Sequence, residues 1–436
     1  MESVVDKKMG VRKPRRRRWR LALLAVLIGL VLLVLGGGML VRLGIIEPIP
    51  LTSWAALRTY IVDRTQPRLV ALQRAIWPVP LTLAEQPTDP QSPTLADIWE
   101  GRAEFVVDIP ATGLPMGESD TVVLRDGRLW SYVHASDRSA GVVDSCGDPV
   151  PFPGCAVIYQ SDDGGMTFAL RESTCLTTCN QCPCALNDEH IDQQQYPRVV
   201  FDGTLLHMVY EYRGMVMHRT SEDGLTWEAP TFVPATGFWA RDFQSCPTGA
   251  AVGDHPHTTP VAECLMGGPP GIYIEGDELY MFVGMGQNPG AMGCYRGRIH
   301  EPIAQLQRCT ANPLFVGATE YGSPAIDATA NVHFDFRTIS SAEVQRIGDR
   351  YYMLYEGVRG PGPGDPGDTQ FGLGLARSTT DQIDGPWEKF AENPLLVDLP
   401  ANIGIGHADL VVMDGVTYLY TSLDGVTRSR LVLQWQ

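Results

Sequence analysis

Positive charge is scarce in most of this 436-residue chain. The net charge is −16, but residues 1–20 carry +7, which leaves −23 on the remainder. A body this acidic repels the phosphates of nucleic acids, so we expect no nucleic-acid partner. The chain also lacks a P-loop, a Rossmann glycine fingerprint, a G-x-S-x-G elbow and an H-E-x-x-H zinc motif. It therefore carries no signature of nucleotide-dependent enzymes, α/β-hydrolases or zinc proteases.

Uncharged residues form one long run, from Leu21 to Val41. As a helix rising about 1.5 Å per residue, this run spans the roughly 30 Å hydrocarbon core of a bilayer. The basic tail 1–20 favours a cytoplasmic N-terminus, so the C-terminal part is expected outside the cytoplasm. A cleaved signal peptide is the main alternative because 36–38 are glycines, and a buried core helix is the other. The run is longer than a usual signal core and no A-x-A site follows, so we predict a single-pass signal-anchor in the cell membrane.

Residues 42–95 have the composition of a spacer. Apolar residues recur at helical spacing over 51–77, with an interruption at Pro67. The next stretch, 78–93, is rich in proline and therefore semi-rigid. We predict a stalk between the membrane and a domain that occupies 96–436.

All ten cysteines follow the predicted membrane span: Cys146, Cys155, Cys175, Cys179, Cys182, Cys184, Cys246, Cys264, Cys294 and Cys309. An even number on the outer side of a membrane favours disulfides. Short separations in sequence predict the pairs Cys146–Cys155, Cys246–Cys264 and Cys294–Cys309. The cluster `CLTTCNQCPC` at 175–184 is expected to form disulfides, with zinc or an iron–sulfur centre as the alternative.

One hairpin pattern recurs five times, at 121–135, 198–212, 272–284, 344–357 and 410–422. Each copy is a β-branched run, a D-G or G-D turn suited to a type I′ hairpin, and alternating aromatic residues. The turn aspartates are Asp126, Asp202, Asp277, Asp349 and Asp414. Units of about 70 residues have the size of propeller blades, and no long amphipathic helix separates them, which excludes a parallel α/β fold. We predict an all-β, five-bladed β-propeller over 96–436.

The chain ends too soon after Asp414 to complete a fifth blade by itself. A closed ring leaves no exposed sheet edge, so a strand must come from elsewhere in the chain. We expect the N-terminal strand Ala103–Ile109 to complete the last blade beside residues 429–435.

Two turns in the second half of the units share a motif. Ser161–Phe168 fits S-x-D-x-G-x-T-[WF], and Ser221–Trp227 is one residue shorter. These segments resemble the Asp-box of sialidases and other β-propellers, in which Asp and Ser bond the backbone and the aromatic residue packs between strands. The resemblance implies a structural role for these turns.

Two further segments resemble five-bladed glycoside hydrolases, notably the family 43 arabinosidases and xylosidases. Residues 375–396, `LARSTTDQIDGPWEKFAENPLL`, are similar to a strand–turn–strand element of that family. Residues 406–422, `GHADLVVMDGVTYLYTS`, are similar to its last inner strand, where a histidine follows a glycine at the propeller axis. The resemblance implies a carbohydrate or glycoconjugate ligand.

The resemblance also implies catalytic carboxyl groups at the axis, where glycosidic hydrolysis uses one acid and one base or nucleophile. Family 43 places an Asp base on blade one, which Asp120 matches. At the blade-two position stand Tyr196 and Arg198. The blade-three position, 267–271, reads `GGPPG` and has no acid, so Glu343 in the next unit is the candidate acid.

Four polar residues before the hairpin strands complete the predicted site. Arg198 must be paired on an inner strand, and we expect it to bind substrate together with Tyr196 and Asp409. His407 is expected at the axis, where it holds a metal ion, such as calcium, or a central water.

Three classes of function fit these observations. The first is a membrane-anchored, extracytoplasmic glycoside hydrolase or lyase. The second is a noncatalytic propeller that binds glycan or protein through a degenerate site, and the third is a structural scaffold. The fold does not choose among them.

Overall fold

The computed structural model describes the chain from residue 91 onward, with gaps. The described residues are 91–115, 118–136, 154–172, 195–212, 215–233, 269–285, 290–317, 334–335, 338–359, 370–397, 405 and 407–436. They belong to one compact unit, Pro78–Gln436. The predicted basic tail, membrane span and most of the stalk lie outside these residues. Among the helices within them, none has the length and hydrophobicity that crossing a bilayer requires.

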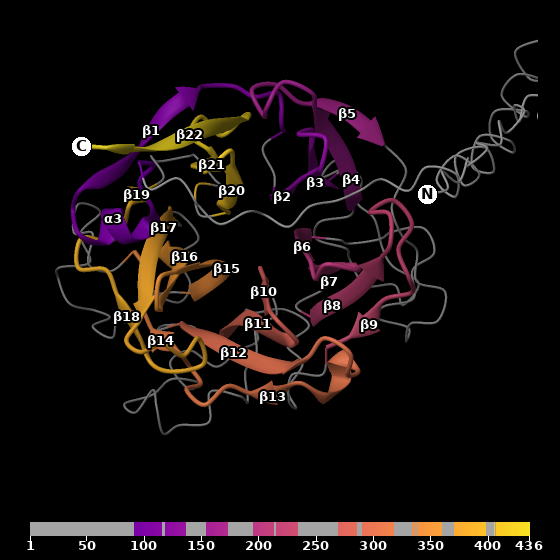
Figure 1. The fold of residues 1–436 in the computed structure, drawn as a ribbon, viewed down its shortest axis with the longest axis vertical. Coiled ribbons are helices and arrows are strands. Elements are labelled where there is room, and N and C mark those ends of the chain that lie inside the picture. Colours follow the sequence, from indigo (N-terminus) through magenta and orange to yellow (C-terminus); the bar gives the residue numbers. More distant parts are fainter. Residues whose placement is uncertain are drawn as a thin grey trace, which may run out of the picture. The chain divides into compact units, whose positions relative to one another are not determined.

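Five antiparallel sheets follow one another around an axis (Figure 1). Blade one consists of β2 (Ser119–Val123), β3 (Leu129–Ser136), β4 (Gly154–Ser161) and β5 (Ala169–Glu172). Blade two consists of β6 (Gln195–Phe201), β7 (Leu206–Tyr212), β8 (Met215–Ser221) and β9 (Thr231–Phe232). Blade three consists of β10 (Gly271–Glu275), β11 (Glu278–Met285), β12 (Ala291–Arg298), β13 (Gln307–Arg308) and β14 (Phe315–Val316), with the 3-10 helix η3 (Ile303–Gln305) between β12 and β13.

Blade four consists of β15 (Thr338–Ile347), β16 (Arg350–Arg359), β17 (Gln370–Ser378), β18 (Trp387–Lys389) and β19 (Leu396–Val397). Blade five consists of β20 (Asp409–Met413), β21 (Val416–Ser422), β22 (Arg428–Trp435) and β1 (Ala103–Ile109). A short helix, α3 (Leu95–Trp99), precedes β1 and buries Leu95 and Ile98. The predicted all-β, five-bladed propeller is confirmed.

The five predicted hairpins form the inner half of each blade, from β2–β3 to β20–β21. The turn type differs from our expectation in four of them. A type I′ turn needs positive φ at both central residues, which holds for Asp414 and Gly415 in blade five. The other four turns each contain one left-handed glycine: Gly127, Gly203, Gly276 and Gly348.

Strand β3 shows why blades of this sequence stack around a ring. Its alternate side chains point to opposite faces of the sheet, and both faces are buried. Trp130 and Tyr132 pack into the core shared with blade two, whereas Leu129 and Val133 pack into the core shared with blade five. Apolar residues on both faces of a middle strand therefore require a blade on each side.

The ring closes by the pairing that the sequence predicted. Strand β1 runs antiparallel to β22, with Phe105 opposite Leu433 and Val107 opposite Leu431. The most N-terminal strand of the described chain thereby completes the blade that the C-terminus begins, and the prediction of this closure is confirmed.

Deleting residues 96–110 is expected to abolish cooperative unfolding, because the deletion removes the outer strand of blade five and the buried Ile98 of α3. Thermal denaturation followed by circular dichroism measures the effect. A deletion variant that melts like the wild type would refute the closure as a source of stability.

The turn Ser161–Phe168 is held by its own polar side chains. The Asp163 carboxylate accepts hydrogen bonds from the backbone nitrogen and the hydroxyl of Thr167, at 2.9 and 2.6 Å. The Ser161 hydroxyl accepts one from the Gly165 nitrogen at 2.8 Å. In blade two, Asp223 accepts from the Thr226 nitrogen at 2.7 Å. A third turn of this kind lies at 422–427 in blade five and was not predicted from the sequence.

These turns also join neighbouring blades. The Tyr420 hydroxyl of blade five donates to the carbonyl oxygen of Gly165 in blade one at 3.0 Å, and its ring meets Phe168 edge-on. Tyr132 of blade one donates in the same way to Gly224 of blade two. The turn glycines therefore sit where a tyrosine from the preceding blade must approach the backbone.

We expect Gly165→Ala to destabilise the protein by about 1–3 kcal/mol more than Gly164→Ala. Both glycines have positive φ, so both variants suffer similar backbone strain. A Cβ atom at Gly165 would overlap the Tyr420 hydroxyl, whereas one at Gly164 meets open space. Chemical denaturation compares the two variants, and equal stabilities would contradict this account of the junction.

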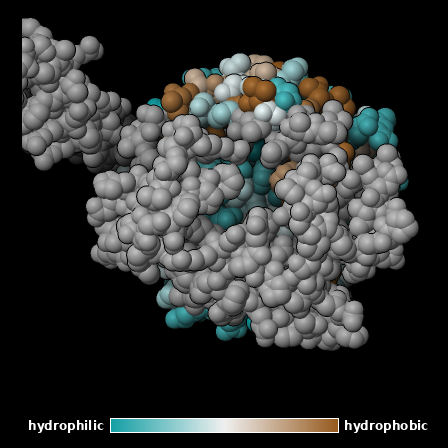
Figure 2. Space-filling model, turned by 180° about the vertical axis from the view of Figure 1, so that it is seen from behind, coloured by the Kyte–Doolittle hydropathy of each residue, from teal (hydrophilic) through white to brown (hydrophobic). Residues whose placement is uncertain are grey.

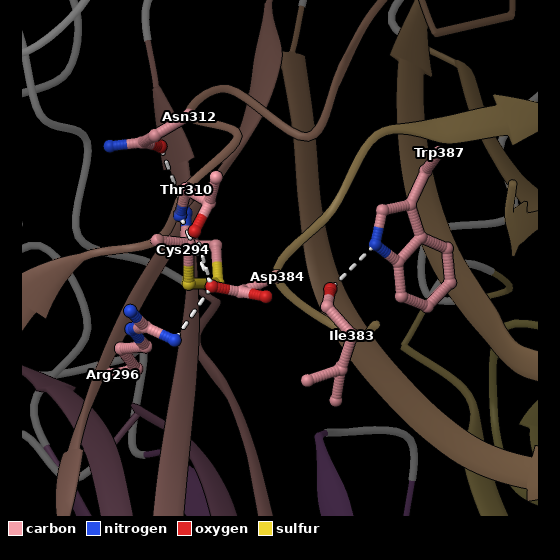
Figure 3. Close-up of a disulfide and its surroundings, with 8 residues drawn as sticks. Cys294, Arg296, Thr310, Asn312, Ile383, Asp384 and Trp387 are labelled. Carbon is pink, nitrogen blue, oxygen red and sulfur yellow. Dashed lines mark hydrogen bonds and ion pairs between the residues drawn. A yellow bond between two sulfur atoms is a disulfide. The ribbon is translucent and has the colours of Figure 1, made fainter. Parts of the chain in front are cut away.

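Blades three and four are joined near a disulfide (Figure 3). Cys294 in β12 is bonded to Cys309, as the sequence predicted. Beside this bond, Asp384 of blade four accepts a hydrogen bond from the Thr310 hydroxyl at 2.7 Å and pairs with Arg296 at 2.8 Å. The predicted pairs Cys146–Cys155 and Cys246–Cys264, and the cluster 175–184, involve side chains outside the described residues.

Candidate functional site

The innermost strands of the blades, β2, β6, β10, β15 and β20, lie around the axis of the ring (Figure 1). Neighbouring inner strands contact one another, for example β2 with both β20 and β6. The face seen in Figure 2 is hollowed at the centre of the ring, and the surface visible inside the hollow is mainly hydrophilic. Polar side chains at the starts of these strands therefore converge on one region.

Arg198, in β6, is the centre of this region and is 5% exposed. Its Nη1 lies 2.5 Å from a Glu343 oxygen and 3.5 Å from an Asp120 oxygen. Its Nη2 donates to the Ser341 hydroxyl at 2.6 Å and to the Ala408 carbonyl at 2.9 Å. One buried cation thus binds groups from blades one, four and five.

Two bulges direct these side chains to the axis. In β6 the register shifts between Gln195 and Arg198, and in β15 it shifts between Ser340 and Glu343. Each bulge contains a non-glycine residue with positive φ, Tyr196 at 54° and Ser341 at 53°. Such backbone strain is characteristic of functional sites, where bulges re-aim side chains. The two bulges place Arg198 and Glu343 within contact of each other.

Asp120 and Glu343 form a coupled pair of carboxyl groups. Both side chains contact the same nitrogen of Arg198. Burial raises the pKa of Glu343 to about 7, although Arg198 opposes the rise. Burial and the nearby charge of Glu343 raise the pKa of Asp120 well above its ordinary value. Both carboxyl groups therefore keep a proton to higher pH than an exposed carboxyl group does.

Asp409 lies near this pair and has no exposed surface. Its carboxylate accepts hydrogen bonds from the Thr121 hydroxyl at 2.7 Å, the Thr121 nitrogen at 3.1 Å and the Ser119 hydroxyl at 3.1 Å. Asp409 thus joins blade five to blade one. This placement differs from the substrate-binding role expected from sequence, because a ligand does not reach a carboxylate that its neighbours enclose.

A second polar group surrounds His407. Its Nε2 lies 3.1 Å from Glu356 and 3.7 Å from Glu118, and Glu118 in turn contacts His134 at 3.4 Å. Burial lowers the pKa of His407 to about 4, so the ring is neutral at pH 7. Burial alone raises the pKa of Glu118, but the hydrogen bond with His134 contributes to lowering it to about 2. At neutral pH, the ionised carboxylate of Glu118 therefore lies beside the neutral imidazole of His407.

Two further contacts hold His407 in position. The Arg428 guanidinium, itself buried, donates to the His407 carbonyl oxygen at 2.7 Å. The half-buried Tyr196 stacks on the His407 ring with centroids 4.9 Å apart. The Tyr196 ring is therefore held in place by a histidine.

The sequence suggested a metal ion at His407. In the part of the chain that the structure describes, no set of three or more His, Cys, Asp or Glu side chains is arranged to hold one. The Nε2 atom of His407 faces Glu356 at hydrogen-bond distance instead. The metal ion at His407 stays a prediction.

The structure thus brings together Asp120, Arg198 and Glu343, and places Tyr196 with His407. Sequence reasoning missed Glu356 and His134, because both lie on second strands rather than inner ones. The register of the hairpins could have identified both residues. Glu356 is directly opposite Ser340, and His134 follows Val133, which is opposite Ser119.

No protein-family model and no curated protein sequence matches this chain. Among solved structures, an endo-arabinase from Bacteroides thetaiotaomicron is similar with 13% identity and a TM-score of 0.42, over 75% of this chain and 96% of that one. An endo-1,4-beta-xylanase from the same organism gives 13% identity and a TM-score of 0.44, over 76% and 97%. A GH32 beta-fructofuranosidase from Bombyx mori gives 12% and 0.43, over 77% and 62%.

Proposed function

We propose that this protein is a glycan-hydrolysing propeller whose acid–base pair is Asp120 and Glu343. The observation that carries the proposal is that two carboxyl groups, Asp120 and Glu343, contact one nitrogen of Arg198 at the propeller axis. Hydrolysis of a glycosidic bond needs one carboxyl that donates a proton and one carboxylate that activates water or attacks the sugar. Two carboxyl groups at unequal distances from one cation can supply both forms at one pH.

The roles follow from the position of Arg198. Glu343, which lies nearer this cation, would act as the ionised base, and Asp120 would protonate the leaving oxygen. These roles are the reverse of those inferred from the family 43 resemblance. The physical reason is that the Arg198 cation lies 1.0 Å closer to Glu343, at 2.5 Å against 3.5 Å, and so favours negative charge there.

A noncatalytic glycan-binding propeller is the second candidate. The observation that favours it is the contact of both Asp120 and Glu343 with one Arg198 nitrogen, at 3.5 and 2.5 Å. Retaining and inverting glycosidases hold their carboxyl groups roughly 5 to 9.5 Å apart, which leaves room for a sugar or water between them. A pair that stays bound to Arg198 when glycan is bound would serve recognition only.

We also propose that the chain is anchored by residues 21–41 and that the propeller lies outside the cytoplasm. The uncharged run, the basic tail before it and the Cys294–Cys309 disulfide support this topology. In the same proposal, the turns at 161–168 and 221–227 are Asp-boxes, supported by the bonds of Asp163 and Asp223.

Glycan microarrays read in two ways separate the two candidates. The wild type and Asp120→Asn are incubated on the same array, and bound protein and the loss of printed glycan are measured together. We expect the wild type to shorten a subset of glycans and the variant to bind that subset without shortening it. Equal retention by both proteins with no glycan shortened would favour the binding function, and no retention on any glycan would contradict both candidates.

A further inference from the structure

Blade three brings no charged side chain to the axis among the residues described, yet it touches the site. Its inner strand begins at Gly271, directly after Pro269 and Pro270, and all three are buried. A Cβ atom at Gly271 would overlap the Ala342 carbonyl oxygen and lie 2.7 Å from the Ala342 Cβ. The absence of a side chain here is therefore what allows the two blades to approach.

Ala342 belongs to the β15 bulge that carries Glu343. The bulge is fixed to blade three by a hydrogen bond from the Ser341 nitrogen to the Pro269 carbonyl at 2.8 Å. The proline rings restrict φ at 269 and 270, so this carbonyl is held in one direction before the bulge contacts it. On its other side, the Ser341 hydroxyl accepts from Arg198. Ser341, whose φ is positive, is thus held between blades three and two.

We propose that Pro269, Pro270 and Gly271 are positioning residues that hold the Ser340–Glu343 bulge where Ser341 and Glu343 both reach Arg198. In the proposed function, on which this role depends for its use in hydrolysis, they replace an acid on blade three with a backbone support for the base on blade four. The position of the bulge itself is testable without any substrate.

Displacing the bulge has a defined electrostatic consequence. Glu343 faces Asp120 from β2, Arg198 from β6 and Asp409 from β20. The Arg198 cation and the Asp120 hydrogen bond lower the pKa of Glu343, whereas burial and Asp409 raise it. A side chain at position 271 pushes Glu343 away from Arg198, so its pKa rises above about 7.

The experiment is a carboxyl carbon-13 NMR titration of the full-length protein in detergent, labelled at glutamate, with Glu343→Gln used to assign the signal. We expect Gly271→Ala to raise the titration midpoint of Glu343 by about one unit or more, a tenfold change in proton affinity. The control is Gly297→Ala on the outer part of the same blade, where a Cβ meets the Leu306 side chain at 2.7 Å. It should leave the midpoint unchanged.

An unchanged midpoint in a folded Gly271→Ala variant would overturn the proposal. If that variant does not fold, Pro269→Ala keeps the carbonyl but frees its direction, and it should shift the midpoint upward by a smaller amount. No shift in Pro269→Ala would also overturn it. A shifted midpoint in a protein that cleaves no glycan would support the positioning role and reject the hydrolase function, so the two proposals fail separately.

Discussion

Asp120→Asn and Glu343→Gln are each expected to lower kcat on aryl-glycoside substrates by about 10²–10⁴-fold. Each substitution keeps the size of the side chain and one acceptor oxygen but removes a group that gains or loses a proton. Asp120 accepts a hydrogen bond from the Val199 nitrogen, which the asparagine oxygen can still accept. The variants should therefore remain folded, with melting temperatures near that of the wild type.

The pH dependence of the wild type follows from the same pair. A base must be ionised, so kcat/KM should rise as pH increases through about 7, the pKa of Glu343. An acid must be protonated, so the rate should fall again at higher pH, where Asp120 loses its proton. Glu343→Gln removes the rising limb, because no carboxylate at position 343 remains to ionise.

Two matched substitutions control for surface charge. Asp126→Asn lies in the exposed turn of the same blade as Asp120, and Glu388→Gln lies on the outer part of blade four, paired with Arg377. Both should keep the wild-type rate and pH profile. Wild-type activity in Asp120→Asn or Glu343→Gln would remove the pair from the mechanism.

Arg198→Met should lower the free energy of unfolding by about 3–5 kcal/mol, the second large effect. The substitution removes a buried cation and leaves Glu343, the Ser341 hydroxyl and the Ala408 carbonyl without their donor. Breaking one side of a buried ion pair is costly because the remaining charge has neither partner nor water. Chemical denaturation of the detergent-solubilised full chain measures the loss.

The cost of Arg198→Met should depend on pH. Without the cation, the folded-state pKa of Glu343 rises further above its unfolded value. The folded protein then binds a proton that the unfolded chain releases, so stability falls as pH rises from about 4.5 and past 7. We therefore expect a larger deficit at pH 8 than at pH 5.5. Arg128→Met, at an exposed pair with Asp126, should cost less than about 1 kcal/mol at either pH. A deficit independent of pH would contradict the pairing.

The fold was largely predictable because its signals are local. Each hairpin has a turn residue at its centre and β-branched or aromatic residues on both sides, and the period of these units gives the number of blades. Even the closure of blade five by β1 could be predicted, since too few residues follow Asp414. The turn type was not predictable, because the adjoining strands decide which central residue takes positive φ.

The site was only partly predictable, because it depends on bulges and on inter-blade contacts. Inner-strand position was enough to select Asp120, Arg198 and Glu343, which the structure brings together. It could not show that Asp409 is enclosed by Thr121, because two polar residues at the starts of neighbouring strands look alike in sequence. It also could not show which of the two carboxyl groups is favoured in its charged form, since that depends on their distances to Arg198.

The most direct measurement of the central claim is product release from a panel of purified polysaccharides, analysed by mass spectrometry of the liberated oligosaccharides. Wild-type protein and Glu343→Gln are compared at pH 7.5, where Glu343 is mostly ionised. We expect the wild type to release oligosaccharides carrying one added water per cleaved bond from at least one polysaccharide, and the variant to release none. Polysaccharide that binds to the wild type but yields no product, or equal yields from both proteins, would contradict it.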